Sequence, residues 1–192
     1  MSHVQVNRDQ VIPARPEDVY DILTDYKNKR QRILTPNFIE YAVEQGGKGP
    51  GTVVSYRLRA GGRERPYRLR IEEPNKGKVV TESDTDSSFV TTWTLAPMAG
   101  GKQTYVSVTS EWEGAHGVKG FFERTFAPLG LRKIYDTMLH QLFHEAGGED
   151  AHSMVDAPAD GGLKANLGLV LGAFGVATIA TVAVILLRQR RK

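Results

Sequence analysis

Apolar and polar residues alternate along seven stretches of the chain, and this period of two predicts an antiparallel β-sheet. The first stretch runs from Val4 to Pro13, and the others are residues 38–44, 52–60, 63–72, 78–84, 87–97 and 103–113. Gly-, Pro- and Asn-rich turns separate them. The alternation directs one set of side chains inward, namely Ile39, Tyr41, Val43, Val54, Tyr56, Leu58, Tyr67, Leu69, Ile71, Phe89, Thr91, Trp93, Leu95, Val106, Val108, Ser110 and Trp112.

A short helix is predicted to follow the first strand. Pro16 suits a first helical position, and two acidic residues behind it favour the positive end of the helix dipole. Apolar residues then recur at positions i, i+3, i+4 and i+7, which gives one apolar face made of Val19, Ile22, Leu23 and Tyr26. The charged residues 27–32 read as a continuation of this helix.

A long helix is predicted over residues 117–146. Its first part carries one apolar stripe, Phe122, Phe126 and Leu129, and its second part another, Leu131, Ile134, Tyr135, Met138 and Leu142. The two stripes point in different directions, and the change falls at residues 128–130. A proline and a glycine lie there, so we expect a kink or a break.

Residues 167–187 contain no charged side chain and are rich in Leu, Val, Ile, Ala and Gly. A helix of this length spans about 31 Å, the thickness of the hydrocarbon core of a bilayer. The alternative is a very apolar core helix, but buried helices seldom run so far without a polar position. We therefore predict a transmembrane helix, followed by a basic flank of Arg188, Arg190, Arg191 and Lys192.

The net charge of +3 comes from this C-terminal region, because residues 1–150 have equal numbers of cations and anions. The N-terminus has no apolar signal-peptide core, so the only insertion signal is at the C-terminus. That is a tail-anchored arrangement, and it favours a cytoplasmic body for this single-pass membrane protein. The cations behind the span argue for the opposite orientation by the positive-inside rule. We give the missing signal peptide more weight.

These patterns divide the chain into three parts. Residues 1–146 form an α+β domain, residues 147–162 an acidic, flexible tether, and residues 163–192 the transmembrane helix with its basic tail. As a random coil the tether would reach about 20–25 Å. Only the 117–146 helix is long enough to cover the inward face of the sheet.

At this point the chain resembles the Bet v 1-like, START-related (SRPBCC) superfamily, in particular its polyketide cyclase/dehydrase and lipid-transport branch. The resemblance covers about residues 3–146 and is carried by residues 11–21, the turn at 49–52, the strand end at 111–113 and the segment 121–124. It implies a helix-grip fold, in which a curved sheet wraps a long C-terminal helix. Members range from carriers to cyclases, so the fold does not fix the function.

The helix-grip fold implies a ligand cavity between the sheet and the long helix, and the inward residues are large and amphipathic. An ordinary filled core is the alternative. We predict that the cavity is lined by Tyr41, Tyr56, Leu58, Tyr67, Leu69, Phe89, Trp93, Val108, Trp112, Phe122, Tyr135 and Met138.

No cofactor and no metal site are expected. The chain has no Cys, which excludes thiolate catalysis and Cys-based zinc sites. His140 and His144 have the spacing of metal ligands but lie opposite the apolar stripe, so we interpret them as surface residues. His116 reads as a loop residue. Residues 46–51 are Gly-rich but lack the features of a phosphate loop, and they are interpreted as a turn.

Six arginines lie on two adjacent predicted strands, at positions 57, 59, 63, 65, 68 and 70. Arg57, Arg59, Arg68 and Arg70 point outward and would meet either anionic lipids or an acidic partner. We favour the alternative, cross-strand pairing with Glu72, Glu82 and Asp84. Nucleic-acid binding is not expected, because no exposed aromatic residues alternate with the cations.

Three functions are compatible with these patterns. The first is a membrane-tethered binding or carrier protein for a hydrophobic small molecule such as a lipid, a quinone or a polyketide. The second is an aromatase/cyclase-type enzyme, which a buried, perturbed Tyr, His or Arg facing the cavity would favour. The third is an interaction module, which a tightly packed interior would favour. Gly168 and Gly172 form a small-xxx-small pair, so a homodimer through the membrane helix is a further hypothesis.

Overall fold

The computed structural model describes residues 2–60, 62–114 and 127–147. The elements in chain order are β1 (Ser2–Ile12), α1 (Pro16–Thr24), the 3-10 helix η1 (Arg30–Ile33), β2 (Phe38–Gln45), β3 (Val53–Ala60), β4 (Arg63–Asn75), β5 (Val79–Asp84), β6 (Val90–Met98), the 3-10 turn η2 (Ala99–Gly101), β7 (Gln103–Gly114) and α3 (Ala127–Gly147).

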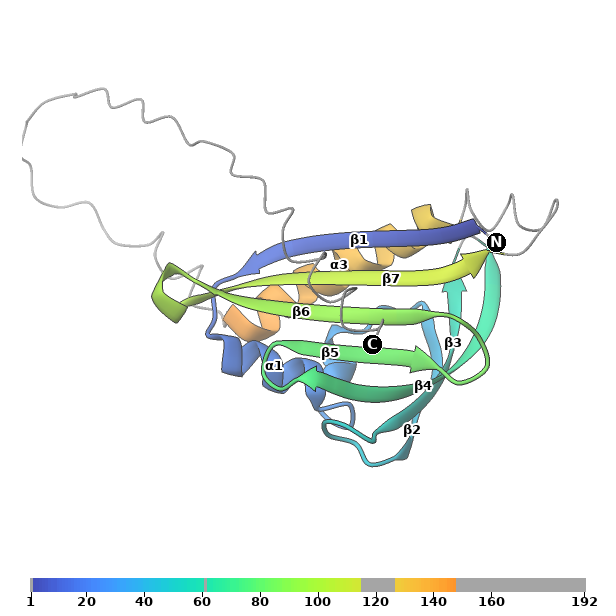
Figure 1. Ribbon diagram of the computed structural model, residues 1–192, viewed down its shortest axis with the longest axis horizontal. Coiled ribbons are helices and arrows are strands. Elements are labelled where there is room, and N and C mark those ends of the chain that lie inside the picture. The colour runs from blue at the N-terminus through green and yellow to red at the C-terminus, as the bar shows by residue number, and fades with distance from the viewer. Residues whose placement is uncertain (1, 61, 115–126, 148–192) are drawn as a thin grey trace, which may run out of the picture. The chain divides into compact units, whose positions relative to one another are not determined.

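The seven strands form one antiparallel sheet in the order β1-β7-β6-β5-β4-β3-β2. Consecutive strands are therefore neighbours, except that β1 pairs with β7, with Val4 opposite Trp112 and Ile12 opposite Thr104. Helices α1 and α3 lie on the same face of the sheet (Figure 1). The predicted antiparallel sheet with a C-terminal helix is confirmed, and this arrangement is consistent with the helix-grip fold.

The inward face of the sheet follows the predicted alternation almost throughout. Val54, Tyr56 and Leu58 of β3 are buried, and so are Thr91, Trp93 and Leu95 of β6 and Val106, Val108, Ser110 and Trp112 of β7. The apolar face of α1 is buried against this surface. All five residues of the second α3 stripe are buried as well.

Ile39 is an exception, because β2 contains a bulge. The pairing register with β3 shifts between Ile39 and Ala42, and Glu40 has a positive φ of 56°. An extra residue at a bulge reverses the faces that follow it. Phe38 therefore packs against the core together with Tyr41 and Val43, and the predicted inward position of Ile39 is wrong.

The predicted helical continuation over residues 27–32 is also wrong. Helix α1 ends at Thr24, and the main-chain N–H groups of Lys29 and Arg30 both donate to the Asp25 carbonyl. The Asp25 carboxylate in turn accepts a hydrogen bond from the Asn28 N–H. This turn ends the helix and carries Arg30 into the interior, where only 3 % of the residue is exposed.

Residues 46–51 form the predicted turn, and Lys48 within it binds Asp21 of α1 with an Nζ–Oδ1 distance of 2.6 Å. The C-terminal end of α3 lies beside the end of β1. A Cβ atom placed on Gly147 would lie 3.1 Å from Cγ of Pro13, so a glycine allows the helix end to approach the end of β1 this closely.

Several predictions fall outside the described residues. They include Phe122, His116, most of the tether, the transmembrane span 167–187 with its basic flank, and the Gly168/Gly172 pair. Of the predicted 117–146 helix, only the part from Ala127 is described. Pro128 lies in its first turn, where a proline costs no helical hydrogen bond, and Leu129 of the predicted first stripe is exposed. No helix within residues 2–60, 62–114 and 127–147 is long and apolar enough to cross a membrane.

Candidate functional site

A band of aromatic rings crosses the inward face of the sheet. Its members are Phe38, Tyr56, Tyr67, Phe89 and Trp112, and the centroids of successive rings are 4.9, 5.7, 4.9 and 5.9 Å apart. The rings come together because inward positions on neighbouring antiparallel strands lie side by side. Tyr67 is half-buried, and the guanidinium carbon of Arg65 lies 5.2 Å from its ring centroid. The band thus has a partly exposed member at its centre, between the buried rings of Tyr56 and Phe89.

A small cavity lies where this band approaches α3 and η1. As bounded by the described residues, its volume is about 20 Å³, enough for one water molecule. Its lining consists of Tyr26, Arg30, Leu34, Phe38, Tyr41, Val54, Tyr56, Glu82, Thr91, Trp93, Tyr135 and Met138. Ligand pockets usually exceed roughly 300 Å³, so a larger molecule would have to displace side chains here.

The structure brings five of the predicted cavity residues to this cavity, namely Tyr41, Tyr56, Trp93, Tyr135 and Met138. Tyr67, Phe89 and Trp112 continue the aromatic band beyond it. Leu58, Leu69 and Val108 belong to the surrounding core. Phe122 is outside the described residues.

The two charged residues of this cavity, Arg30 and Glu82, were not predicted to line it. Arg30 Nη2 and the Tyr26 hydroxyl each donate to Glu82 Oε1, both at 2.8 Å. The guanidinium carbon of Arg30 also lies 4.3 Å from the ring centroid of Trp93. Glu82 stands opposite Ile71 on the inward face of β5, so strict alternation from Val80 would have placed it inside. No sequence pattern marks Arg30.

Two donors of the cavity lining are left without a partner. Within the described part of the chain, neither Arg30 Nη1 nor Trp93 Nε1 makes a hydrogen bond, and both atoms are buried. Buried polar groups are nearly always paired, because an unpaired one costs roughly 1–3 kcal/mol. Because Arg30 and Trp93 both line the cavity, an oxygen acceptor bound there, from a water molecule or from a ligand, can pair with these donors.

A second polar group lies on the α3 side of the cavity. The hydroxyls of Thr91 and Ser110 are 2.7 Å apart, and the Tyr135 hydroxyl is hydrogen-bonded to both. Burial raises the pKa of Tyr135 to about 12 and the pKa values of Tyr26 and Tyr56 well above their usual range. These phenols stay protonated at neutral pH and act as hydrogen-bond donors rather than as bases.

Burial lowers and the Glu82 carboxylate raises the pKa of Arg30, and the net direction is upward, so the guanidinium remains charged. The charges of Arg30 and Glu82 therefore compensate one another inside the cavity. Such a site can bind and polarise an oxygen atom through fixed donors. None of the described residues in the lining is a histidine.

The histidines predicted to lie on the surface do so. His140 and His144 are exposed, and their Nε2 atoms are 3.3 Å apart. Among the described residues, no three His, Asp or Glu side chains are grouped as metal ligands would be.

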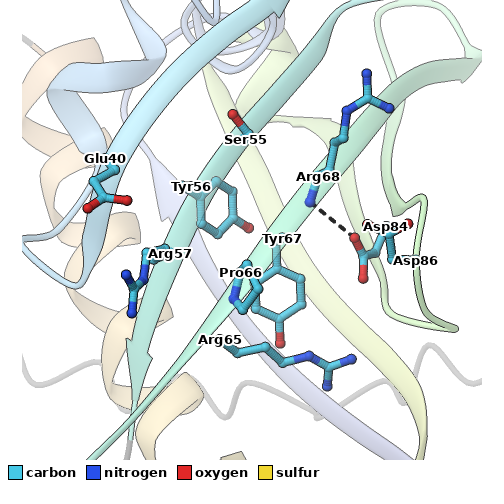
Figure 2. A pocket seen from close by; sticks show the side chains of 10 residues that line it. All are labelled: Glu40, Ser55, Tyr56, Arg57, Arg65, Pro66, Tyr67, Arg68, Asp84 and Asp86. Carbon is cyan, nitrogen blue, oxygen red and sulfur yellow. Dashed lines mark hydrogen bonds between the residues drawn. The ribbon is translucent and has the colours of Figure 1, made fainter.

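Three of the four outward arginines are paired, but not with the predicted partners. Arg57 and Arg59 both bind Glu64, and Arg68 binds Glu44. Glu82 is occupied by Arg30, and Asp84 instead accepts a hydrogen bond from the main-chain N–H of Arg68 (Figure 2). An open depression of about 500 Å³ lies over β3 and β4, and its charged lining consists of Glu40, Arg57, Arg65, Arg68, Asp84 and Asp86. The mixed charge gives this depression no marked preference for anions or cations.

Residues 3–146 match the family described as "Polyketide cyclase / dehydrase and lipid transport". The solution structure of KanY protein (ms6282) is 38% identical, with 77% of this chain and 100% of that chain covered and a TM-score of 0.67. No curated protein matches the chain.

Two more distant structures share the fold. The Zhui aromatase/cyclase from Streptomyces sp. R1128 is 14% identical, covers 76% of this chain and 94% of its own, and has a TM-score of 0.62. A START superfamily protein from Mycobacterium smegmatis is 13% identical, with 76% and 98% covered and a TM-score of 0.56. The family match to residues 3–146 of this chain includes nearly all of the described strands and helices. This chain therefore belongs to the polyketide cyclase/dehydrase and lipid-transport family.

Proposed function

We propose that the protein is a membrane-tethered binding protein that carries a hydrophobic small molecule between the sheet and α3. One observation carries this proposal: an aromatic-walled cavity that holds two buried hydrogen-bond donors without a partner. Donors of this kind need an acceptor from outside the protein, and a ligand oxygen can supply it. Membership of a family with lipid-transport members agrees with a hydrophobic ligand.

Enlargement of the cavity is part of this proposal, because about 20 Å³ does not admit a lipid. Met138 is the most adaptable side chain of the lining, since its unbranched thioether has several rotatable bonds. Such side chains would move, and the ligand would occupy the space that they fill in the empty protein. Its apolar part would lie along the aromatic band.

Ligand uptake tests the proposal. We expect native mass spectrometry of the detergent-extracted full-length protein to detect a bound lipophilic molecule after incubation with membrane lipid extract. Met138→Trp fills the cavity and is expected to abolish this uptake, at a stability cost of about 1–3 kcal/mol from overpacking. Leu129→Trp, on the exposed side of the same helix, is the matched control and should bind as the wild type does. An empty wild-type protein would favour the interaction module, which the small cavity volume also supports.

An aromatase/cyclase-type enzyme using the same cavity is the second candidate. The charged Arg30 and the protonated phenols favour it, because such donors polarise a carbonyl group. The one carboxylate of the described lining, Glu82, already accepts hydrogen bonds from Tyr26 and Arg30, which favours binding over proton transfer. Conversion of a bound polyketone, followed by mass spectrometry, would decide for the enzyme.

The membrane tether is a further part of the proposal, with the body on the cytoplasmic side. It rests on the uncharged residues 167–187 and the basic flank behind them. A charged residue at the centre of a span costs roughly 2.5–3.5 kcal/mol on the insertion scale. We therefore expect the double substitution Val176→Arg/Ile179→Arg to release the protein from membranes in a flotation assay. Met154→Arg/Val155→Arg, in the tether, adds the same charge and should leave flotation unchanged; co-release of this control would contradict the assignment of the span.

A further inference from the structure

We infer that the ligand presents a neutral oxygen acceptor, of the ketone, ester or quinone class, to Arg30 Nη1, and that free carboxylic acids are disfavoured. This inference rests on the proposed function and specifies the ligand of the same cavity. It follows from the hydrogen bonds that the Arg30 guanidinium makes and from the one donor atom that makes none.

The guanidinium carries several N–H donors in a fixed planar arrangement, and only some of them make hydrogen bonds within the fold. Nη2 donates to Glu82 Oε1 at 2.8 Å, and this ion pair is almost completely buried, with 4% and 8% of the two side chains exposed. Nη1 has no partner among the described residues. The planar group stacks over Trp93, whose Nε1 is the second unpaired donor. Both donors thus belong to one small region of the lining.

The charge of the cavity decides which acceptor fits. Arg30 and Glu82 already neutralise each other, so an ionised carboxylate would leave one uncompensated negative charge in a buried site. Burying a charge without compensation is far more costly than burying a neutral carbonyl group. A carbonyl oxygen accepts the Nη1 hydrogen bond and leaves the site neutral.

The geometry also gives the ligand a direction. The cavity volume of about 20 Å³ suits a single polar group rather than a chain. Phe38 and Tyr56 line the cavity and are also members of the aromatic band. A carbonyl group at Arg30 therefore places the remaining hydrocarbon along the band, toward the half-buried Tyr67.

Three probes of matched chain length test this inference on the full-length protein in detergent micelles: 2-tridecanone, dodecanoic acid and tridecane. A hydrogen bond from a charged donor corresponds to about 10- to 100-fold in affinity. We expect the ketone to bind more tightly than the alkane by this factor and the acid to bind no better than the alkane. In the double variant Arg30→Met/Glu82→Gln, which removes both charges together, the ratio of ketone to alkane affinity should fall to about one.

The infrared band of a ¹³C-labelled ketone carbonyl is an independent readout. We expect it to shift to lower frequency in the wild-type protein relative to hexadecane solution, because the guanidinium polarises the carbonyl bond, and to lose this shift in the double variant. If the double variant does not fold, an unshifted band in the wild type overturns the inference.

The outcomes separate this inference from the proposed function. If none of the three probes binds, both fail. If ketone and alkane bind equally, or if the acid binds most tightly, the protein still binds hydrophobic molecules and only the carbonyl inference is overturned.

Discussion

Replacing Arg30 by methionine is expected to destabilise the fold by about 3–5 kcal/mol, because it leaves the buried Glu82 carboxylate without its cation. The Tyr26 hydroxyl alone would then hydrogen-bond this charge. Unfolding by urea measures the effect, and the fluorescence of Trp93 and Trp112 reports on it directly, since these two tryptophans are the only ones in the chain and both lie in the sheet.

Two further variants separate the buried charge from the loss of a large side chain. Arg57→Met removes an exposed arginine that is paired with Glu64, and it should cost about 0–1 kcal/mol. The double variant Arg30→Met/Glu82→Gln should recover most of the stability that Arg30→Met loses, because no uncompensated charge remains. A double variant as unstable as the single one would contradict this explanation and point to packing by the arginine side chain instead.

Replacing Leu142 by alanine is expected to cost about 2–5 kcal/mol, since this α3 side chain is completely buried in the core. Residues of this stripe contribute much of the packing that holds α3 on the sheet. Leu129→Ala is the matched control on the same helix: 58 % of Leu129 is exposed, and its loss should change the free energy of unfolding by no more than about 0.5 kcal/mol. Equal effects of the two substitutions in urea unfolding would show that α3 does not pack on the sheet as described.

The sheet could be predicted from sequence because each strand obeys a local rule. Inward residues recur at every second position, and neighbouring strands in the chain are neighbours in space. The same rule brought Tyr56, Tyr67, Phe89 and Trp112 into one band. It failed at Ile39, because a bulge adds one residue without any change in composition.

The polar part of the site could not be predicted in the same way. Arg30 and Glu82 are 52 positions apart, and a charged residue looks the same in a sequence whether it is exposed or buried. The turn at Asp25 decides the position of Arg30, and its hydrogen bonds become visible only in three dimensions. The alternation along β5 does predict an inward position for Glu82, two residues after Val80. Glutamate is usually exposed, however, so the residue type argues against that position.

The close approach of Gly147 to Pro13 places the end of α3 beside the end of β1. Pro13 follows Ile12, which is paired with Thr104 at the start of β7, whereas Trp112 lies near the other end of that strand. Eight residues of β-strand separate Thr104 from Trp112, about 26 Å. A larger side chain at position 147 would therefore disturb the sheet at the Ile12–Thr104 end, and Trp112 would lie about 26 Å from that disturbance.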